Sequence, residues 1–183
     1  MLNQIDKTLT AFGVNVVSAA KNNLTKNNNA GELANSLTYE ITKQSEKIEL
    51  TFYGTSYGNF HDKGVQGAAP NKLPRGSKWY GVNKAPGSPF KFGSGTGRKG
   101  GLRGAIDRWV VSKPISDARN AKGQFIKRKS LVYLISRTIY LSGTKATDFF
   151  SKPFDLFKKN LFKDLSNAFA QDVREITFKN NGK

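Results

Sequence analysis

The fold of this chain depends most on residues 37–52, which read LTYEITKQSEKIELTF. Apolar residues alternate with polar ones on both sides of the central KQSEK: Leu37, Tyr39, Ile41, Ile48, Leu50 and Phe52. A period of two places every second side chain on the same face of a β-strand. The stretch therefore predicts a β-hairpin with one buried face.

On either side of the hairpin, apolar residues recur every three or four positions, which is the spacing of an amphipathic helix. The stripe before the hairpin comprises Ile5, Leu9, Phe12, Val16 and Ala20. The stripe near the C-terminus comprises Phe154, Phe157, Leu161, Leu165 and Phe169. Residues 102–110 and 131–139 carry two shorter stripes, and Gly143 follows the second as a helix-ending glycine.

Helices around a hairpin predict an α+β fold, in which the N-terminal and C-terminal helices pack on a small antiparallel sheet. A chain of 183 residues has the size of one domain, so we expect residues 1–183 to form a single domain. Residues 55–67, TSYGNFHDKGVQG, are punctuated by glycines and predict a strand end or a structured loop. Residues 68–101 have no usable period and predict an extended, basic, glycine-rich loop or arm inserted into the domain.

Most of the net charge of +17 lies in residues 71–130. This stretch holds 15 Lys and Arg against 2 Asp, a net charge of +13, together with 10 of the 18 glycines. A segment this basic and this poor in apolar residues buries too little surface to order itself. We expect it to need a polyanion, an acidic protein surface or neighbouring copies of the same chain.

The basic residues that we expect to contact a polyanion or an assembly partner are Lys78, Lys84, Lys91, Arg98, Lys99, Arg103, Arg119, Lys122, Lys127, Arg128 and Lys129. The aromatic residues among them, which we expect to anchor the loop against a neighbour, are Trp79, Tyr80, Phe90 and Phe92. Cations interleaved with rings also suit phosphate attraction and base stacking on nucleic acid. No recognition helix, RNP-like sequence or zinc finger accompanies them, so we do not expect base-specific readout.

Catalytic chemistry has little support in the sequence. The chain has no cysteine, which excludes disulfides, thiolate zinc sites and cysteine nucleophiles. His61 is the single histidine, and no partner motif accompanies it and the adjacent Asp62. Residues 95–100 match the GxGxxG pattern, but prolines and a glycine precede them where a strand is required. We therefore interpret 95–100 as a flexible linker and expect no catalytic, metal or cofactor-binding site.

Nothing in the sequence predicts a membrane segment. The chain lacks a run of 18 apolar residues, and Asp6 and Lys7 interrupt the apolar spacing near its start, unlike the core of a signal peptide. The phenylalanine-rich residues 149–162 suit a core or a subunit interface better than a membrane-bound helix, because Asp155 and Asp164 interrupt the cationic face. We expect a protein that is made and used in a cytoplasm.

Several segments follow one another in a recognisable order. After the N-terminal helix come GELANSLTYEI and ELTFYGTSYGNFHDKGVQG, and later GQFIKRKSLVYLISRTIYLSGTKAT and FFSKPFDLF. In these segments the chain resembles the minor tail component, neck and tail-completion proteins of tailed bacteriophages. The resemblance covers about two-thirds of the chain, and its motif positions are Tyr57, Phe60, Gly64, Pro153 and Phe154. Compact members of that family lack the basic insertion between Gly67 and Leu102.

The resemblance implies a non-enzymatic structural protein of the virion, located at the head–tail junction. It implies a homo-oligomeric ring of six or twelve copies that joins the capsid connector to the tail. Such a ring contacts portal, adaptor and tail proteins and forms part of the conduit for DNA during genome ejection. It is assembled in the host cytoplasm and has no membrane partner. The alternative that the residues leave open is a sequence-nonspecific nucleic-acid-binding protein.

Overall fold

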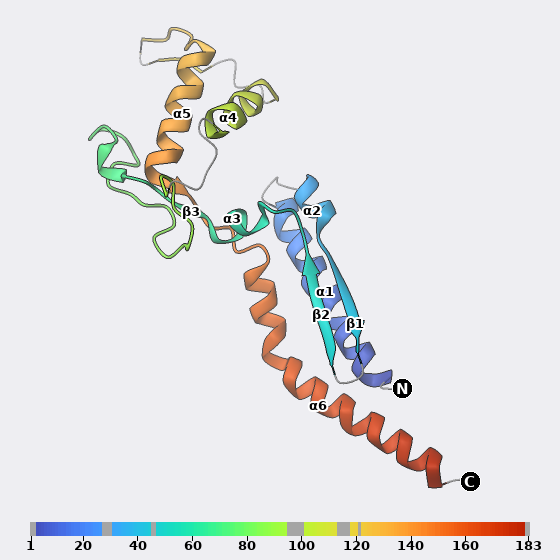
Figure 1. The fold of residues 1–183 in the computed structure, drawn as a ribbon. Helices are drawn as coiled ribbons and strands as arrows, with labels where there is room; N and C mark the ends of the chain where they lie inside the picture. The colour runs from blue at the N-terminus through green and yellow to red at the C-terminus, as the bar shows by residue number, and fades with distance from the viewer. Residues whose placement is uncertain are drawn as a thin grey trace. The chain divides into compact units, whose positions relative to one another are not determined.

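The computed structural model describes residues 3–26, 31–44, 47–94, 101–112, 118–120 and 122–181. Within these residues it has six α-helices and two antiparallel sheets of two strands each, with 59% helix and 12% strand (Figure 1). The predicted α+β class is therefore confirmed. The sequence predicts one domain, and the chain divides into two compact units. We call residues 1–62 and 148–183 the terminal unit, and residues 63–147 the inserted unit.

The terminal unit is built from helices around one β-hairpin. Its elements are α1 (Asn3–Lys26), α2 (Glu32–Ser36), β1 (Thr38–Lys43), β2 (Ile48–Tyr53), α3 (Gly58–Lys63, whose last residue belongs to the inserted unit) and α6 (Ser151–Asn181). The predicted hairpin is confirmed, with Tyr39 opposite Phe52 and Ile41 opposite Leu50. Within this unit, α1 runs beside the hairpin and beside α6 (Figure 1).

The core of the terminal unit lies where the predicted apolar stripes meet. Val16, Ala20 and Leu24 on α1 are fully buried, and Leu33, Leu37 and Phe149 pack in the same region. A second group of rings joins α1, β2 and the first turn of α6, with ring centroids 5.3 to 6.2 Å apart: Phe12, Phe52, Phe150 and Phe154. The close approach of α1 to β1 requires Gly13, because a Cβ there would lie 2.6 Å from the Tyr39 ring.

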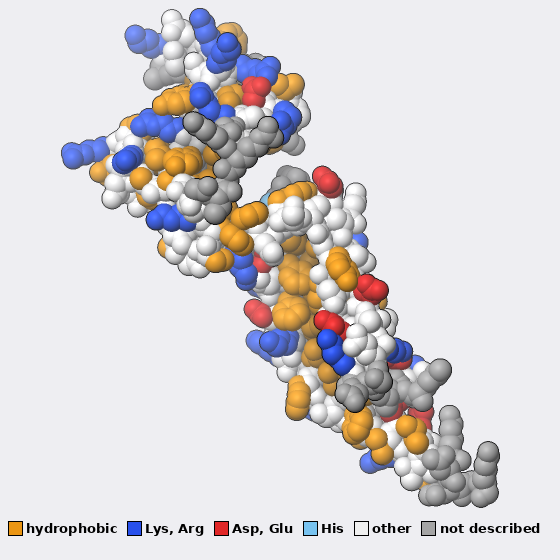
Figure 2. Space-filling model, viewed as in Figure 1, with side chains coloured by type: hydrophobic (Ala, Val, Ile, Leu, Met, Phe, Trp, Pro, Cys, Tyr) orange, Lys and Arg blue, Asp and Glu red, His pale blue; other side chains and the backbone are white. Residues whose placement is uncertain are grey.

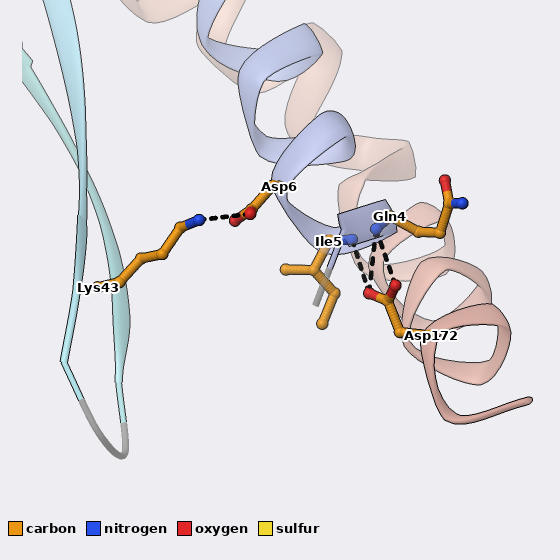
Figure 3. Close-up of polar contacts among 5 residues, drawn as sticks. All are labelled: Gln4, Ile5, Asp6, Lys43 and Asp172. Carbon is orange, nitrogen blue, oxygen red and sulfur yellow. Dashed lines mark hydrogen bonds and ion pairs between the residues drawn. The ribbon is translucent and has the colours of Figure 1, made fainter. Parts of the chain in front are cut away.

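Polar contacts connect the first turn of α1 to α6 and to β1 (Figure 3). The Asp172 carboxylate of α6 accepts hydrogen bonds from the backbone N–H groups of Gln4 (2.9 Å) and Ile5 (3.1 Å). These N–H groups lie at the N-terminus of α1, where a negative charge also interacts favourably with the helix dipole. Lys43 at the end of β1 forms an ion pair with Asp6 of α1.

The sequence reading of residues 55–67 as a strand end or loop needs correction, because the structure forms helix α3 there. The helix α2 was also not predicted. Both helices have only five or six residues, too short for apolar periodicity to be visible. Packing within the terminal unit stabilises them instead: Leu33 and Ala34 of α2 are buried, and Asp62 of α3 is buried against the start of α6.

The inserted unit is centred on helix α5. Its elements are β3 (Val65–Gln66), the 3₁₀-helix η1 (Pro70–Lys72), α4 (Gly101–Ser112), α5 (Arg128–Ser142) and β4 (Gly143–Thr144). The predicted helix end at Gly143 is confirmed: this residue has φ of 87° and donates its N–H to the Ile139 carbonyl. Residues 113–117, which follow α4 and include Pro114, lie outside the described part of the chain.

The two ends of the inserted unit pair with each other through β3 and β4. A Cβ on Gly143 would lie 2.2 Å from the Val65 carbonyl oxygen, and a Cβ on Gly67 would lie 2.1 Å from that of Leu141. Real Cβ atoms do not come so close to backbone, so only glycine fits at either crossing. These glycines let the segment that enters the unit lie directly on the segment that leaves it.

Of the loop or arm predicted over residues 68–101, the structure describes residues 68–94 and 101. Residues 68–94 are irregular apart from η1, and they fold onto the end of α5. Ala68 donates its N–H to the Tyr140 carbonyl (2.9 Å), and Lys84 donates its N–H to that of Ser142 (2.8 Å). Leu73 and Ala85 are buried. Backbone hydrogen bonds to the last turn of α5 thus supply order that apolar periodicity does not reveal.

Candidate functional site

Charge divides sharply between the two units. The inserted unit holds 18 Lys and Arg against 2 Asp, a net charge of +16, whereas the terminal unit has a net charge of +1. Figure 2 shows Lys and Arg side chains gathered over the inserted unit, at the top of the view. A surface of one sign attracts polyanions and repels other copies of itself. The candidate site is therefore the cationic surface of the inserted unit.

Most of the predicted contact residues that the structure describes are exposed on this surface: Lys78, Lys91, Arg103, Arg119, Lys122, Lys127, Arg128 and Lys129. Arg98 and Lys99, together with the GxGxxG-like residues 95–100, lie outside the described residues. Two of the arginines lie over rings, with the guanidinium carbon of Arg119 3.8 Å from the Phe125 centroid and that of Arg103 5.4 Å from the Tyr133 centroid. These cation–π contacts fix the direction of long side chains that are otherwise mobile.

Arg128 has a partner within the chain. Its guanidinium donates two hydrogen bonds to the Asp107 carboxylate, at 2.8 and 2.6 Å, and so joins α5 to α4. These hydrogen bonds lower the pKa of Asp107 below its ordinary value. Because this acid is neutralised locally, it contributes little negative field against an approaching anion.

Lys84 is the predicted cation that the structure buries most deeply. It is half-buried, and burial lowers its pKa. Its ammonium lies 4.2 Å from the centroid of the Trp79 ring, and the ammonium of Lys78 lies 5.2 Å from the same centroid. A ring close to two ammonium groups stabilises both through its π-electrons.

Beside Lys84 lies an open groove of about 320 Å³ along one face of α5. Its other lining residues are Leu134, Ile135, Thr138 and Ile139. The groove combines an aliphatic floor with a cation at its edge. Such a surface suits an acidic protein segment with apolar side chains better than a phosphate backbone, which gains nothing from aliphatic contact.

The predicted aromatic anchors occupy different environments. Trp79, Phe90 and Phe92 are half-buried, and the Phe92 ring lies 5.9 Å from that of Tyr140 on α5. The backbone of Phe90 is also held, since its carbonyl accepts the N–H of Gln66 (2.8 Å). Tyr80 is more exposed, at 38%. The Phe92 ring and the Phe90 backbone therefore anchor the loop to α5 and β3 of the same unit.

The adjacent His61 and Asp62 lie on α3 and have structural contacts. The Asp62 carboxylate accepts hydrogen bonds from the N–H groups of Phe150 (2.9 Å) and Ser151 (3.1 Å) and from the Ser151 hydroxyl, which caps α6. The His61 ring lies edge-on to Phe149, with centroids 5.9 Å apart. Burial lowers the pKa of His61, although the neighbouring Asp62 acts to raise it.

Sequence reasoning missed one surface of α6. The predicted stripe is half-buried at Phe154, Phe157, Leu161 and Leu165, as an interior stripe should be. A separate row of apolar side chains is exposed: Phe162 (84%), Phe169 (54%), Val173 (43%) and Ile176 (43%). Phe169 was assigned to the buried stripe, and its exposure corrects that assignment. The signal for a second row was present in the three- and four-residue spacing of these positions.

Among the described residues, no group of three or more His, Asp and Glu side chains is arranged to hold a metal ion. No helix in the described ranges is both long enough and apolar enough to cross a membrane. Comparison with protein-family models, with curated proteins and with solved structures finds no match to this chain.

Proposed function

We propose that this chain is a structural protein of the head–tail junction of a tailed bacteriophage. It assembles as a homo-oligomeric ring of six or twelve copies. The ring joins the capsid connector to the tail, contacts portal, adaptor and tail proteins, and forms part of the DNA conduit.

The observation that carries this proposal is the division of surface properties between the units. A ring protein needs one surface that accepts identical copies and another that recognises different neighbours. The inserted unit, at +16, repels its own copies and attracts acidic partners. The terminal unit, at +1, has exposed apolar side chains along α6 and little charge to oppose self-association. The two requirements are thus met by different parts of one chain.

Four of the five positions that carry the resemblance to phage tail proteins lie within the terminal unit, and the fifth, Gly64, lies in the inserted unit. Phe60 lies on α3, a helix that begins at the residue after Tyr57. Pro153 and Phe154 lie in the first turn of α6. Asp62 connects these two places by capping α6. The motif around Tyr57 and Phe60 is therefore joined to the motif at Pro153 and Phe154, although they are far apart in the sequence. This contact supports the interpretation that the motifs belong together.

A second candidate function is sequence-nonspecific binding of nucleic acid. The observation that favours it is the exposed cationic surface, where Arg119 and Arg103 lie over aromatic rings. Lys and Arg neutralise phosphates and release counterions, which gives an affinity that depends steeply on salt. The aliphatic groove beside Lys84 favours a protein partner instead.

Two measurements on the full chain test the proposal. Light scattering over a range of protein concentrations should reveal a closed species of six or twelve copies, with ring-shaped particles in negative stain. Affinity for a duplex DNA should be weak at physiological salt. A chain that stays monomeric at every concentration, and binds DNA with a steep log–log dependence on salt, would overturn the proposal in favour of the second candidate.

A further inference from the structure

We infer that the C-terminal half of α6 is the surface through which one copy of this chain binds a second copy. This inference rests on the proposed ring. A seam that packs on an equivalent seam makes a two-fold contact, which would hold copies together in pairs within such an assembly. We call the row Phe162, Ser166, Phe169, Val173 and Ile176 the α6 seam.

The seam has the spacing of a coiled coil. Its positions follow one another at intervals of four, three, four and three residues. This is the a/d pattern of a heptad repeat, which places the side chains in one row along a helix that packs on another helix. Phe162 is 84% exposed and Phe169 is 54% exposed. Large rings at such exposure, in register along two turns or more, are typical of an interaction surface.

The seam is separate from the face of α6 that packs inside the terminal unit. Ala168 and Asp172 are buried, and Leu161 and Leu165 are half-buried. Ala168 lies one position before Phe169, and Asp172 lies one before Val173, so the seam is turned by about 100° around the helix axis from the buried row. Asp172 is occupied in capping α1 (Figure 3). The internal partners of α6 therefore leave the seam uncovered in the part of the terminal unit that the structure describes.

Figure 2 shows hydrophobic side chains in a row of patches along the terminal unit, in the lower part of the view. Lys, Arg, Asp and Glu side chains lie beside these patches, so charges of both signs are present on this unit. An uncharged apolar row on an otherwise polar helix gains stability when an equivalent row covers it.

Charge selects a second copy as the occupant. The e positions beside the seam are Lys163, Ala170 and Thr177, and the last two, which flank its C-terminal part, carry no charge. An identical helix therefore meets no like-charge repulsion there, and the terminal unit as a whole is close to neutral at +1. A strongly acidic or basic partner would find no complementary charges beside these positions.

Cysteine cross-linking tests the inference cleanly, because the chain has no cysteine of its own. Ser166→Cys places a thiol within the seam, and the matched control Asn167→Cys places one on the next residue, which points away from it. Both native side chains are exposed, and the Ser166 hydroxyl bonds only to the Phe162 carbonyl of its own helix (2.9 Å) among the contacts of the described chain. The full-length variants are treated with a short bis-maleimide at the concentration where light scattering detects self-association.

We expect Ser166→Cys to give covalent dimers in at least tenfold higher yield than Asn167→Cys. Adding Phe169→Glu to Ser166→Cys should remove the product, because the glutamate would be buried without a partner. Val173→Glu serves as an independent disruption if the first variant fails to fold, and circular dichroism of each variant checks the fold.

The outcomes separate this inference from the proposed function. If the chain self-associates but both cysteines cross-link equally, or if neither disruption lowers the yield, the seam is not the interface and a ring through another surface stands. If the chain is monomeric at all concentrations and no variant cross-links, both the inference and the ring are overturned.

Discussion

The terminal unit and the inserted unit reach a folded state in different ways. The terminal unit buries long apolar stripes, with Val16, Leu24 and Phe149 at 2% exposure or less. The inserted unit buries a few scattered residues and relies on backbone hydrogen bonds around the end of α5 and on the glycines at its two ends. In this chain, whose net charge is +17, the main apolar core and most of the positive charge therefore lie in different units. The near-neutral unit provides apolar packing, and the cationic unit presents charge.

The largest effect is expected from Phe149→Ala. Phe149 is 2% exposed within the core cluster of the terminal unit, so its truncation leaves a cavity and costs about 3–5 kcal/mol of unfolding free energy. Hydrogen exchange should show faster exchange across α1, the hairpin and α6, and little change in α5. The same truncation to alanine at Leu156, which is 59% exposed on α6 and lies outside the seam, is the control and should leave exchange unaltered. Equal loss of protection in both units would show that they do not differ as described.

Gly143→Ala should destabilise the inserted unit selectively. The residue has φ of 87°, and its Cβ would lie 2.2 Å from the Val65 carbonyl oxygen, so strain and a backbone clash combine. We expect a loss of about 1–3 kcal/mol or more, seen as faster exchange in α5. Gly123→Ala shares the positive φ without a nearby atom and should cost less, whereas Gly76→Ala has neither and should be neutral. If Gly123→Ala or Gly76→Ala destabilised the protein more than Gly143→Ala, the role given to the β3–β4 crossing would be contradicted.

Acid should weaken the terminal unit through Asp172. Burial acts to raise the pKa of this carboxyl, but the N–H donors at the start of α1 outweigh it and hold the pKa below its ordinary value. A group with a lowered pKa stabilises the folded state above its unfolded-state pKa, and that stabilisation is lost as the pH falls through the folded-state value. The difference in unfolding free energy between wild type and Asp172→Asn should therefore be constant near pH 7 and shrink below about pH 4. A difference that grew on acidification would contradict this account.

Salt should have the smallest effect, and it should stabilise the inserted unit more than the terminal unit. The cations of the inserted unit repel one another, and raising ionic strength from about 0.01 to about 0.15 M shortens the screening length from about 30 to about 8 Å. We expect the inserted unit to gain about 1 kcal/mol or less, and the terminal unit to change less than that. Salt titration followed by hydrogen exchange in α5 and α1 measures both. If salt slowed exchange in α1 and left exchange in α5 unchanged, the contrast between the two units would be contradicted.

Local sequence patterns were enough to predict the framework of the terminal unit. The alternation in residues 37–52 matches the observed hairpin, and the stripes match α1 and α6. Gly143 marks the end of α5 as expected. These features depend on neighbours two to four positions apart, which a sequence displays directly.

Features that depend on distant residues were not predictable from the same patterns. Asp62 caps a helix that begins about 90 residues later, and spacing gives no sign of such a pair. Residues 68–94 are ordered by backbone bonds to the end of α5, which leave no trace in hydrophobicity. The cationic residues were recognised by composition, but the groove beside Lys84 depends on how the loop lies along α5. The exposed α6 seam has the same helical period as the buried stripe. The sequence therefore does not show which of the two rows is buried, and only the folded structure distinguishes them.

The central claim is that the two units make different kinds of contact, and hydrogen exchange of the full chain tests it most directly. Exchange would be compared at low and high protein concentration, and then at low concentration with polyglutamate or duplex DNA added. We predict that concentration slows exchange along residues 162–176 of α6, while polyglutamate slows exchange in α5 and residues 68–94 more than DNA does. Protection of the inserted unit by concentration alone, or protection of the same unit by both treatments, would contradict the claim.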